Sequence, residues 1–242
     1  MKTGTLYGIG VGPGDPELIT MKGARLLRSC RHIFVPKART AADSVALSIA
    51  NKYLPAQSEI HELVFPMTSD RVELSRRWRA SAREIAGVLA GGEDACFLTL
   101  GDPLLYSTYI YLLRALRLEI PEAGIVTVPG INAFSAAAAL TEFPVGEGKE
   151  RVTIIPTADD LEEVKRALSG GGTVILMKIG RRLSEILHLL EEASLIGKGV
   201  FVSHAGMENQ RVETDLRRLK EESPDAGYLS IILVDTQRKN KG

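Results

Sequence analysis

The stretch over residues 96–108 is the feature that most constrains the fold of this chain. It begins as a short apolar run, typical of a buried parallel strand, and breaks abruptly at Gly101-Asp102-Pro103. The glycine lets the backbone approach a ligand closely, and the proline delays the next helix, which Ser107 or Thr108 can cap. Ligands of open α/β sheets bind at the carboxyl ends of strands, where this loop should lie. An ordinary strand–loop–helix turn has the same features, so the neighbouring loops must distinguish the two interpretations.

The alternation of short apolar runs with amphipathic segments continues along the whole chain. Strands are predicted over residues 5–9, 32–35, 60–65, 124–128, 151–155, 172–177, 200–203 and 228–234, and helices over residues 16–30, 41–53, 70–89, 109–118, 136–140, 159–168 and 181–193. Alternating strands and helices predict an α/β fold. Residues 142–150 are rich in Gly and Pro, and the alternation restarts beyond them. We therefore expect two α/β domains, residues 1–143 and 149–242.

Composition and charge exclude several classes of protein. Thirty basic residues balance thirty acidic ones, so no net field attracts nucleic acid or an anionic membrane, and 5% aromatic residues are too few for a base-stacking platform. Cys30 and Cys96 lack metal or redox spacing, which indicates core thiols of a reducing compartment. There is no signal-peptide pattern, and no apolar run approaches the ~20 residues that span a bilayer. We expect a soluble, cytoplasmic protein.

A glycine cluster follows the first predicted strand. The dinucleotide-binding pattern G-x-G-x-x-G fails here, because Pro13, Asp15 or Glu17 stands where the third glycine belongs. Asp15 is a good N-cap for the next helix, and Pro16 suits its first position. We interpret the loop as a tight turn that exposes backbone amides at the mouth of a cleft.

Other strand ends also carry open or polar loops. Pro129-Gly130-Ile131-Asn132 opens a helix whose amides would face a ligand, and the repetition favours a ligand loop at Gly101-Asp102-Pro103 as well. Three strand ends of the second half are similar: Met177-Lys178, His204-Ala205-Gly206 and Tyr228-Leu229-Ser230. Taken singly, Met177 and Tyr228 would more often be core residues. Lys37 and Arg39 end the second strand and could either hold an anionic ligand or lie in a solvated loop.

Dedicated catalytic machinery is missing from the sequence pattern. The four histidines (His32, His61, His188 and His204) lack zinc-ligand spacing, so we expect no metal site. No G-x-S-x-G elbow or Cys–His pairing indicates a covalent nucleophile. This profile fits a reaction that depends on a reactive cofactor and on positioning.

Three motifs in combination resemble the tetrapyrrole (corrin/porphyrin) methylases, which are S-adenosylmethionine-dependent enzymes. These motifs are residues 10–20, Gly101-Asp102-Pro103 and Pro129-Gly130-Ile131-Asn132, and the resemblance covers essentially the whole chain. Residues 34–38 and Pro66-Met67-Thr68 look most like the precorrin-2 C(20)-methyltransferases, including forms that accept cobalt-precorrin-2. The resemblance implies two α/β domains with a cofactor cleft between them, in a homodimer that acts in cobalamin biosynthesis.

The resemblance also implies a set of site residues. Cofactor contacts would come from Leu100, Gly101, Asp102, Ser107, Thr108, Asn132, Ala133, Met177, Ala205, Tyr228, Leu229 and Ser230, and substrate contacts from Pro13, Gly14, Lys37, Arg39 and Lys178. The product of the cofactor would be S-adenosylhomocysteine. Because the sulfonium is already activated, the protein mainly has to align the reacting atoms, and Tyr106 and Asp102 are candidates to accept the proton released afterwards.

Two alternatives stay open at this point. The chain could methylate another corrin position or another substrate, such as a diphthine precursor, which product mass and regiochemistry would reveal. It could also be a nucleotide-binding regulatory module, which would bind adenosine ligands without methyl transfer. Whether the tetrapyrrole arrives with cobalt is not encoded, because a metal held in the ring needs no protein ligand.

Overall fold

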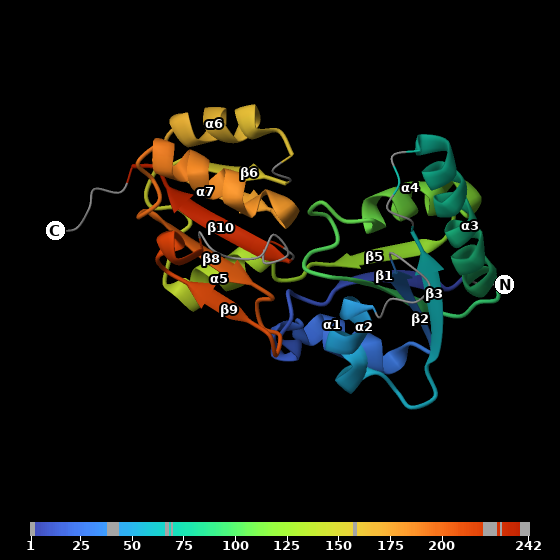
Figure 1. Cartoon of the computed structure of the whole chain (residues 1–242). Helices are drawn as coiled ribbons and strands as arrows, with labels where there is room; N and C mark the ends of the chain where they lie inside the picture. The colour runs from blue at the N-terminus through green and yellow to red at the C-terminus, as the bar shows by residue number, and fades with distance from the viewer. Residues whose placement is uncertain are drawn as a thin grey trace. The chain divides into compact units, whose positions relative to one another are not determined.

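The structure is a computed structural model that describes residues 3–37, 44–65, 68, 70–156, 159–219, 227 and 229–237. Contacts between Cα atoms divide the chain into two compact units, Met1–Asn132 and Ala133–Gly242. Each unit contains one five-stranded sheet covered by helices, so the predicted α/β class is confirmed (Figure 1). Among the described helices, none has the length and apolar character needed to cross a membrane.

The first unit is an all-parallel sheet with helical connections. Its strands are β1 (Thr5–Gly10), β2 (His32–Lys37), β3 (Glu59–Val64), β4 (Ala95–Thr99) and β5 (Gly124–Val128), in the order β3-β2-β4-β1-β5. Its helices are α1 (Met21–Ser29), α2 (Val45–Ala50), α3 (Arg71–Ala90) and α4 (Tyr109–Glu119), with short 3-10 turns at Pro16–Leu18 and Asn51–Tyr53. As predicted, β4 is buried along its whole length, because helices cover both faces of the sheet.

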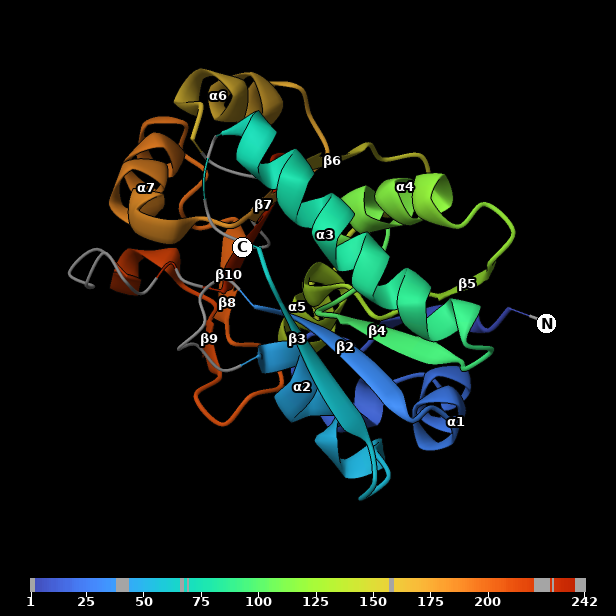
Figure 2. The same ribbon diagram turned by 90° about the vertical axis from the view of Figure 1, so that its right-hand side faces the viewer.

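Alternate side chains of each strand face different helices. Phe97 packs in a cluster with α3 and α4, whereas its neighbours Cys96 and Leu98 pack with α1 and α2. Figure 2 shows α3 and α4 on one side of this sheet and α1 and α2 on the other. The first unit is therefore a three-layer sandwich in which β1 leads to one helical layer and β4 to the other.

Several local predictions for the first unit need correction. The helix expected over residues 16–30 is broken, because Ile19 is extended and the Thr20 side chain caps a new helix by accepting from Gly23 N. Asp15 does accept from Glu17 N, so its capping role is confirmed. The helix expected over residues 41–53 is α2 plus a 3-10 turn, and residues 41–43 lie outside the described part. In α3, Val72 is exposed although the spacing placed it in the core.

The second unit is a mixed sheet with helices on both faces. Its strands are β6 (Val152–Ile155), β7 (Thr173–Met177), β8 (Gly199–Ser203), β9 (Arg211–Glu213) and β10 (Ser230–Asp235), in the order β6-β7-β10-β8-β9. Its helices are α5 (Ala133–Thr141), α6 (Leu161–Ser169) and α7 (Leu183–Glu192), with 3-10 turns at Gly180–Arg182 and Leu216–Leu219. Strand β10 runs antiparallel to β7 and β8, and β6 runs parallel to β7. The α6 and α7 helices pack on one face and α5 on the other.

The boundary between the two compact units lies earlier in the sequence than the linker composition suggested. We expected the helix near residues 136–140 to end the first domain, but α5 packs with the second unit. Its residues Ala136 and Ala137 and the following Phe143 are buried in a cluster with side chains of β7, β8 and β10. The Gly- and Pro-rich segment over residues 142–150, which we expected to be the linker, connects α5 to β6 inside the second unit, and its residues 146–150 are exposed.

Candidate functional site

The carboxyl ends of β1 and β4 form the strongest site candidate in the first unit. These strands are neighbours, and the chain leaves them toward opposite faces of the sheet, which is the arrangement at which α/β sheets bind ligands. Their loops are joined by backbone hydrogen bonds. Gly101 N donates to Gly12 O over 2.8 Å, and Gly12 N donates to Gly101 O over 3.4 Å. The two loops named from the sequence therefore form one structure.

Three glycines allow the backbones of these strand ends to touch. A Cβ atom on Gly130, just beyond β5, would lie 2.1 Å from Gly101 O. A Cβ atom on Gly10 would lie 2.6 Å from both Gly101 O and Gly130 N. Gly101 itself has a φ of +70°, which only glycine adopts readily. The motifs contained Gly10 and Gly130, but sequence reasoning did not select them as site residues, because their role depends on contacts between distant loops.

Asp102 connects the β4 loop to the β5 loop. Its Oδ1 accepts from Leu104 N over 2.8 Å, and its Oδ2 accepts from Gly130 N over 3.0 Å. Both carboxylate oxygens therefore accept hydrogen bonds from backbone amides, which hold the side chain in one orientation. The bond to Gly130 spans 28 residues, which an ordinary strand–loop–helix turn would not form. This observation favours the ligand-loop interpretation of Gly101-Asp102-Pro103.

The residues that follow the β4 loop have different environments. Tyr106 is 44% exposed, and Leu100 and Thr108 are half-buried. The buried Ser107 hydroxyl donates to Pro103 O over 2.8 Å and accepts from Tyr109 N over 3.0 Å, so Ser107 supplies the predicted cap of α4. Thr108 makes no side-chain cap bond.

Tyr109 is a buried residue that the sequence reasoning missed. Its ring occupies the space above Gly8, where a Cβ atom would lie 2.3 Å from Tyr109 Cζ. Its hydroxyl is 2.9 Å from Thr127 Oγ1, and burial raises the pKa of the Tyr109 phenol. A glycine in a buried strand opposite a helix-start tyrosine was the only available signal. Tyr109 thus ties the start of α4 to β1 and β5.

The predicted residues of the second unit gather at one end of its sheet. Because β10 is antiparallel to β7 and β8, the start of β10 lies beside their carboxyl ends: Ile231 pairs with Met177, and Ser230 pairs with Ser203. His204 N donates to Leu229 O over 3.0 Å, which places the loop containing the buried Ala205 at the same end. Tyr228 lies outside the described residues.

Backbone strain marks the same strand ends. Among the described non-glycine residues, six have positive φ, and four of these are Tyr106, Lys178, His204 and Leu229. All four lie at or next to predicted site residues. Such conformations cost about 1–3 kcal/mol each and concentrate at functional sites. The strain therefore supports the carboxyl ends of β4, β7 and β8 and the start of β10 as ligand-binding positions.

Comparison with known proteins places this chain in a family. The family model of the tetrapyrrole (corrin/porphyrin) methylases matches residues 5–220. The chain belongs to the tetrapyrrole methylase family. It is 34% identical over 234 residues to a cobalt-precorrin-2 C(20)-methyltransferase of Salmonella typhimurium, which covers 97% of each chain. It is 28% identical to a precorrin-2 C(20)-methyltransferase of a Sinorhizobium species, with 96% of this chain and 95% of the relative covered.

A solved structure of a tetrapyrrole methylase has a similar fold. The uroporphyrin-III C-methyltransferase of Thermus thermophilus, solved with S-adenosylhomocysteine, gives a TM-score of 0.64 at 19% identity, covering 96% of this chain and 97% of that one. The fold of this family member is thus that of a tetrapyrrole methylase.

The residues predicted to contact the substrate differ in exposure in this tetrapyrrole methylase, and some lie outside the described residues. Pro13 and Gly14 are buried in the loop after β1, and Lys178 is exposed after β7. Lys37 lies at the carboxyl end of β2 as expected, but its side chain is only 8% exposed and Nζ is 2.8 Å from Glu62 Oε1. Arg39 and the motif residues Pro66 and Met67 lie outside the described part of the chain.

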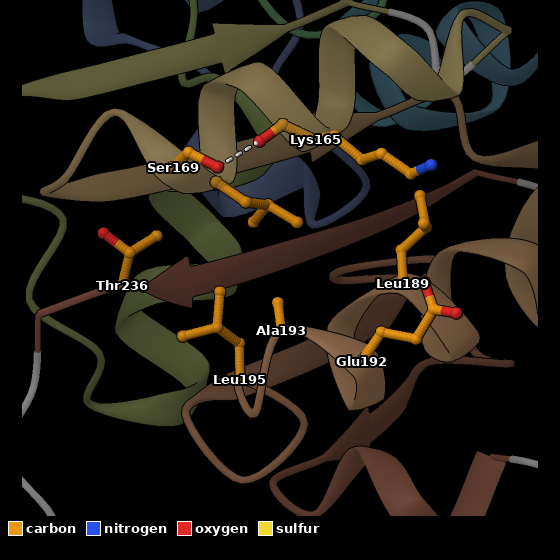
Figure 3. A pocket seen from close by; sticks show the side chains of 8 residues that line it. Lys165, Ser169, Leu189, Glu192, Ala193, Leu195 and Thr236 are labelled. Atoms are coloured by element: carbon orange, nitrogen blue, oxygen red, sulfur yellow. Dashed lines mark hydrogen bonds between the residues drawn. The ribbon is translucent and has the colours of Figure 1, made fainter.

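The second unit also contains a pocket of about 510 Å³ that is separate from the predicted cofactor residues. Figure 3 shows its lining, which comes from α6, α7 and the residues beyond them: Lys165, Leu168, Ser169, Leu189, Glu192, Ala193, Leu195 and Thr236. Thr236 follows the carboxyl end of β10, whereas Leu229 and Ser230 precede or begin that strand. The pocket therefore lies toward the other end of the sheet and is not part of the candidate site.

Proposed function

We propose that this chain is an S-adenosylmethionine-dependent methyltransferase that methylates carbon 20 of precorrin-2 or cobalt-precorrin-2 in cobalamin biosynthesis. The observation that carries the proposal is the 34% identity to the Salmonella typhimurium enzyme over 97% of both chains. The geometry agrees with it, because open glycine loops and a held carboxylate suit a reaction that needs alignment more than acid–base groups.

The strand ends fit an adenosyl cofactor with an amino-acid end. In the first unit, Leu100, Gly101, Asp102, Ser107 and Thr108, with Asn132 and Ala133 of the β5 loop, would hold the amino-acid portion. The Thr99 hydroxyl, just before this loop, is buried and has no partner among the described residues, so it could also donate to a ligand. Bound S-adenosylmethionine would supply an activated methyl group.

The second unit would contribute to the adenosine portion. Met177, Ala205, Tyr228, Leu229 and Ser230 would frame it largely through backbone atoms. The Ser230 hydroxyl supports this interpretation, because it already donates to Gly227 O over 2.6 Å and so stabilises the strand start rather than facing a ligand. Left-handed φ at Leu229 and His204 turns the backbone at these ends.

Two side chains are our candidates to accept the proton that leaves carbon 20 after methylation. Asp102 is held in one orientation by two amides, and Tyr106 is exposed beside the same loop. The substrate's carboxylates would be held by the Pro13 and Gly14 loop together with Lys178, Arg39 or Lys37. We propose in addition that the protein is a cytoplasmic homodimer, which light scattering on the purified chain would test.

The first test is anaerobic incubation with S-adenosylmethionine and either precorrin-2 or its cobalt complex. We expect a product heavier by one methyl group, which NMR should place on carbon 20. Whichever substrate is methylated faster shows whether cobalt is inserted before or after this step. Methylation at another carbon would assign the chain to another branch of the family. Tight S-adenosylhomocysteine binding without methylation of either substrate, or of a diphthine precursor, would favour a regulatory module.

A matched pair of variants tests the site. Asp102→Ala should lower the methylation rate about 100-fold or more and weaken S-adenosylhomocysteine binding, because the loops of β4 and β5 lose their connection. Asp94→Ala is the control: Asp94 also accepts from a backbone amide, Thr5 N at 2.7 Å, but at the amino end of the same sheet. Equal rates for wild type and Asp102→Ala would exclude Asp102 from the site.

A further inference from the structure

Two of the four histidines meet at the amino end of the first sheet. Sequence spacing showed no metal pattern, yet the parallel pairing of β2 with β3 brings His32 and His61 together, because His32 pairs with Glu59 and Phe34 pairs with His61. Glu59 and His61 are two residues apart on β3 and so point to the same face. His32, Glu59 and His61 form what we call the edge cluster, since β3 is the outer strand of the sheet.

The donor atoms of the edge cluster have the spacing of a metal site. His32 Nδ1 is 3.0 Å from His61 Nε2 and 3.5 Å from Glu59 Oε2, and the three donors lie within 4.8 Å of one another. Ligands about 2.0–2.1 Å from a tetrahedral zinc ion are about 3.3 Å apart, so small side-chain shifts suffice. Two imidazoles and one carboxylate are a donor set that suits zinc rather than magnesium or calcium.

Each histidine also has a carboxylate at its other nitrogen. His32 Nε2 is 3.0 Å from Glu93 Oε2, and His61 Nδ1 is 3.5 Å from Glu84 Oε1. A carboxylate on the remote nitrogen orients an imidazole and raises its basicity in metal sites. This second set of partners is independent of the donor distances, and it directs both remaining nitrogens toward one point.

The surroundings restrict the histidines and leave one side open. His32 is buried, and the His61 ring stacks on Phe34 with centroids 4.5 Å apart. Glu59 is exposed and is hydrogen-bonded to Arg31, which holds the pKa of the Glu59 carboxyl below its usual range. The open side gives an ion access and leaves a coordination position for water.

We propose that His32, His61 and Glu59 bind a zinc ion, with Glu93 and Glu84 orienting the two imidazoles. The ion would join the edge strand β3 to β2. Because the edge cluster lies at the amino ends of the strands, opposite the glycine loops, the ion stabilises the sheet and takes no part in methyl transfer. The proposal does not depend on the proposed function.

The test is zinc binding to tag-free protein that has been treated with chelator and then freed of it. Calorimetric titration should show one zinc ion per chain, and zinc should raise the midpoint of thermal unfolding, because it binds the folded state. Cobalt(II) in place of zinc should give visible absorption bands of a four-coordinate nitrogen–oxygen site. Absence of binding at 100 µM zinc would leave the edge cluster as a plain hydrogen-bonded network and overturn the proposal.

Variants separate this site from adventitious binding. Glu59→Gln changes an exposed ligand and should lower zinc affinity at least tenfold, and Glu93→Gln should lower it about 10- to 100-fold through His32. The control His188→Gln removes an exposed histidine of α7, which pairs with Glu192, and should bind zinc as wild type does. Loss of binding in His188→Gln, or unchanged affinity in both edge-cluster variants, would overturn the proposal. Circular dichroism verifies that each variant is folded.

Discussion

At the residue scale, the close contact between strand ends in the first unit requires glycine, because glycine has no Cβ atom. Gly10 ends β1, and Gly101 and Gly130 lie in the loops after β4 and β5. A Cβ atom on Gly10 or on Gly130 would lie 2.6 or 2.1 Å from the carbonyl oxygen of Gly101 and would collide with it. Asp102 then uses both carboxylate oxygens to hold this contact. The contact between these strand ends thus rests on main-chain geometry supported by one acidic side chain.

The glycine contact leads to a prediction about stability. Gly130→Ala should lower the free energy of unfolding by about 3 kcal/mol, because the new Cβ atom would lie 2.1 Å from Gly101 O and the backbone must move. Gly87→Ala is the control: no atom lies within 4 Å of its Cβ position on α3, and the change should stabilise by about 0.5–1 kcal/mol. Urea denaturation measures both. Equal effects would show that the loops tolerate the methyl group.

At the element scale, the strands of one sheet differ in how completely their side chains are buried. Central β4 has helices on both faces, whereas β3 is the outer strand and has exposed side chains, including Ile60 at 39% exposure. The central strand carries the predicted ligand loop, Gly101-Asp102-Pro103, at its carboxyl end. Its complete burial gives that loop a rigid base, which suits a site that works by positioning.

This difference between strands can be measured. Leu98→Ala in β4 should cost about 2–5 kcal/mol, because Leu98 is fully buried and its removal leaves a cavity. Ile60→Ala in β3 should cost about 1 kcal/mol or less, because part of the side chain is already in water. Chemical denaturation at equilibrium gives both values. A similar loss in the free energy of unfolding at the two positions would mean that the Ile60 side chain is buried in solution.

At the scale of the whole molecule, α5 determines where the second unit begins. The helix follows directly on the β5 loop, yet its buried face belongs to the core around Ile175, Val202 and Leu233. The Asn132–Ala133 bond therefore joins two cores, and residues on both of its sides are predicted to contact the cofactor.

Hydrogen exchange tests this assignment of α5. Ala137→Asp places a charge in the second core and should destabilise that unit by about 3 kcal/mol, so amides of β8 and β10 exchange faster while those of β1 and β4 keep their rates. Ala139→Asp puts the same side chain on the exposed face of α5 and should leave all rates unchanged. Faster exchange in β1 and β4 alone would assign α5 to the first unit.

Local patterns in the sequence were sufficient for most of the elements, although not for β9, and three motifs carried the resemblance to the family. Strand–helix alternation, the Asp15 cap and the three motifs each lie within a short window, where propensity, hydrogen bonding of neighbours and burial period act directly. These patterns predicted the α/β class and the buried β4 strand, and the resemblance of the three motifs implied the tetrapyrrole methylase family. They were less accurate where a nearby residue can form an alternative cap: the Thr20 side chain starts a new helix and so breaks the helix predicted over residues 16–30.

Contacts between distant residues were decided only by the tertiary structure. The strand order places Gly12 against Gly101, Asp102 against Gly130 and His32 against His61, and it assigns α5 to the second sheet. No short window contains both members of these pairs, and the order of parallel strands follows from how whole layers pack. The sequence therefore determined which residue types stand at the strand ends, and the packing of the layers decided which of them meet.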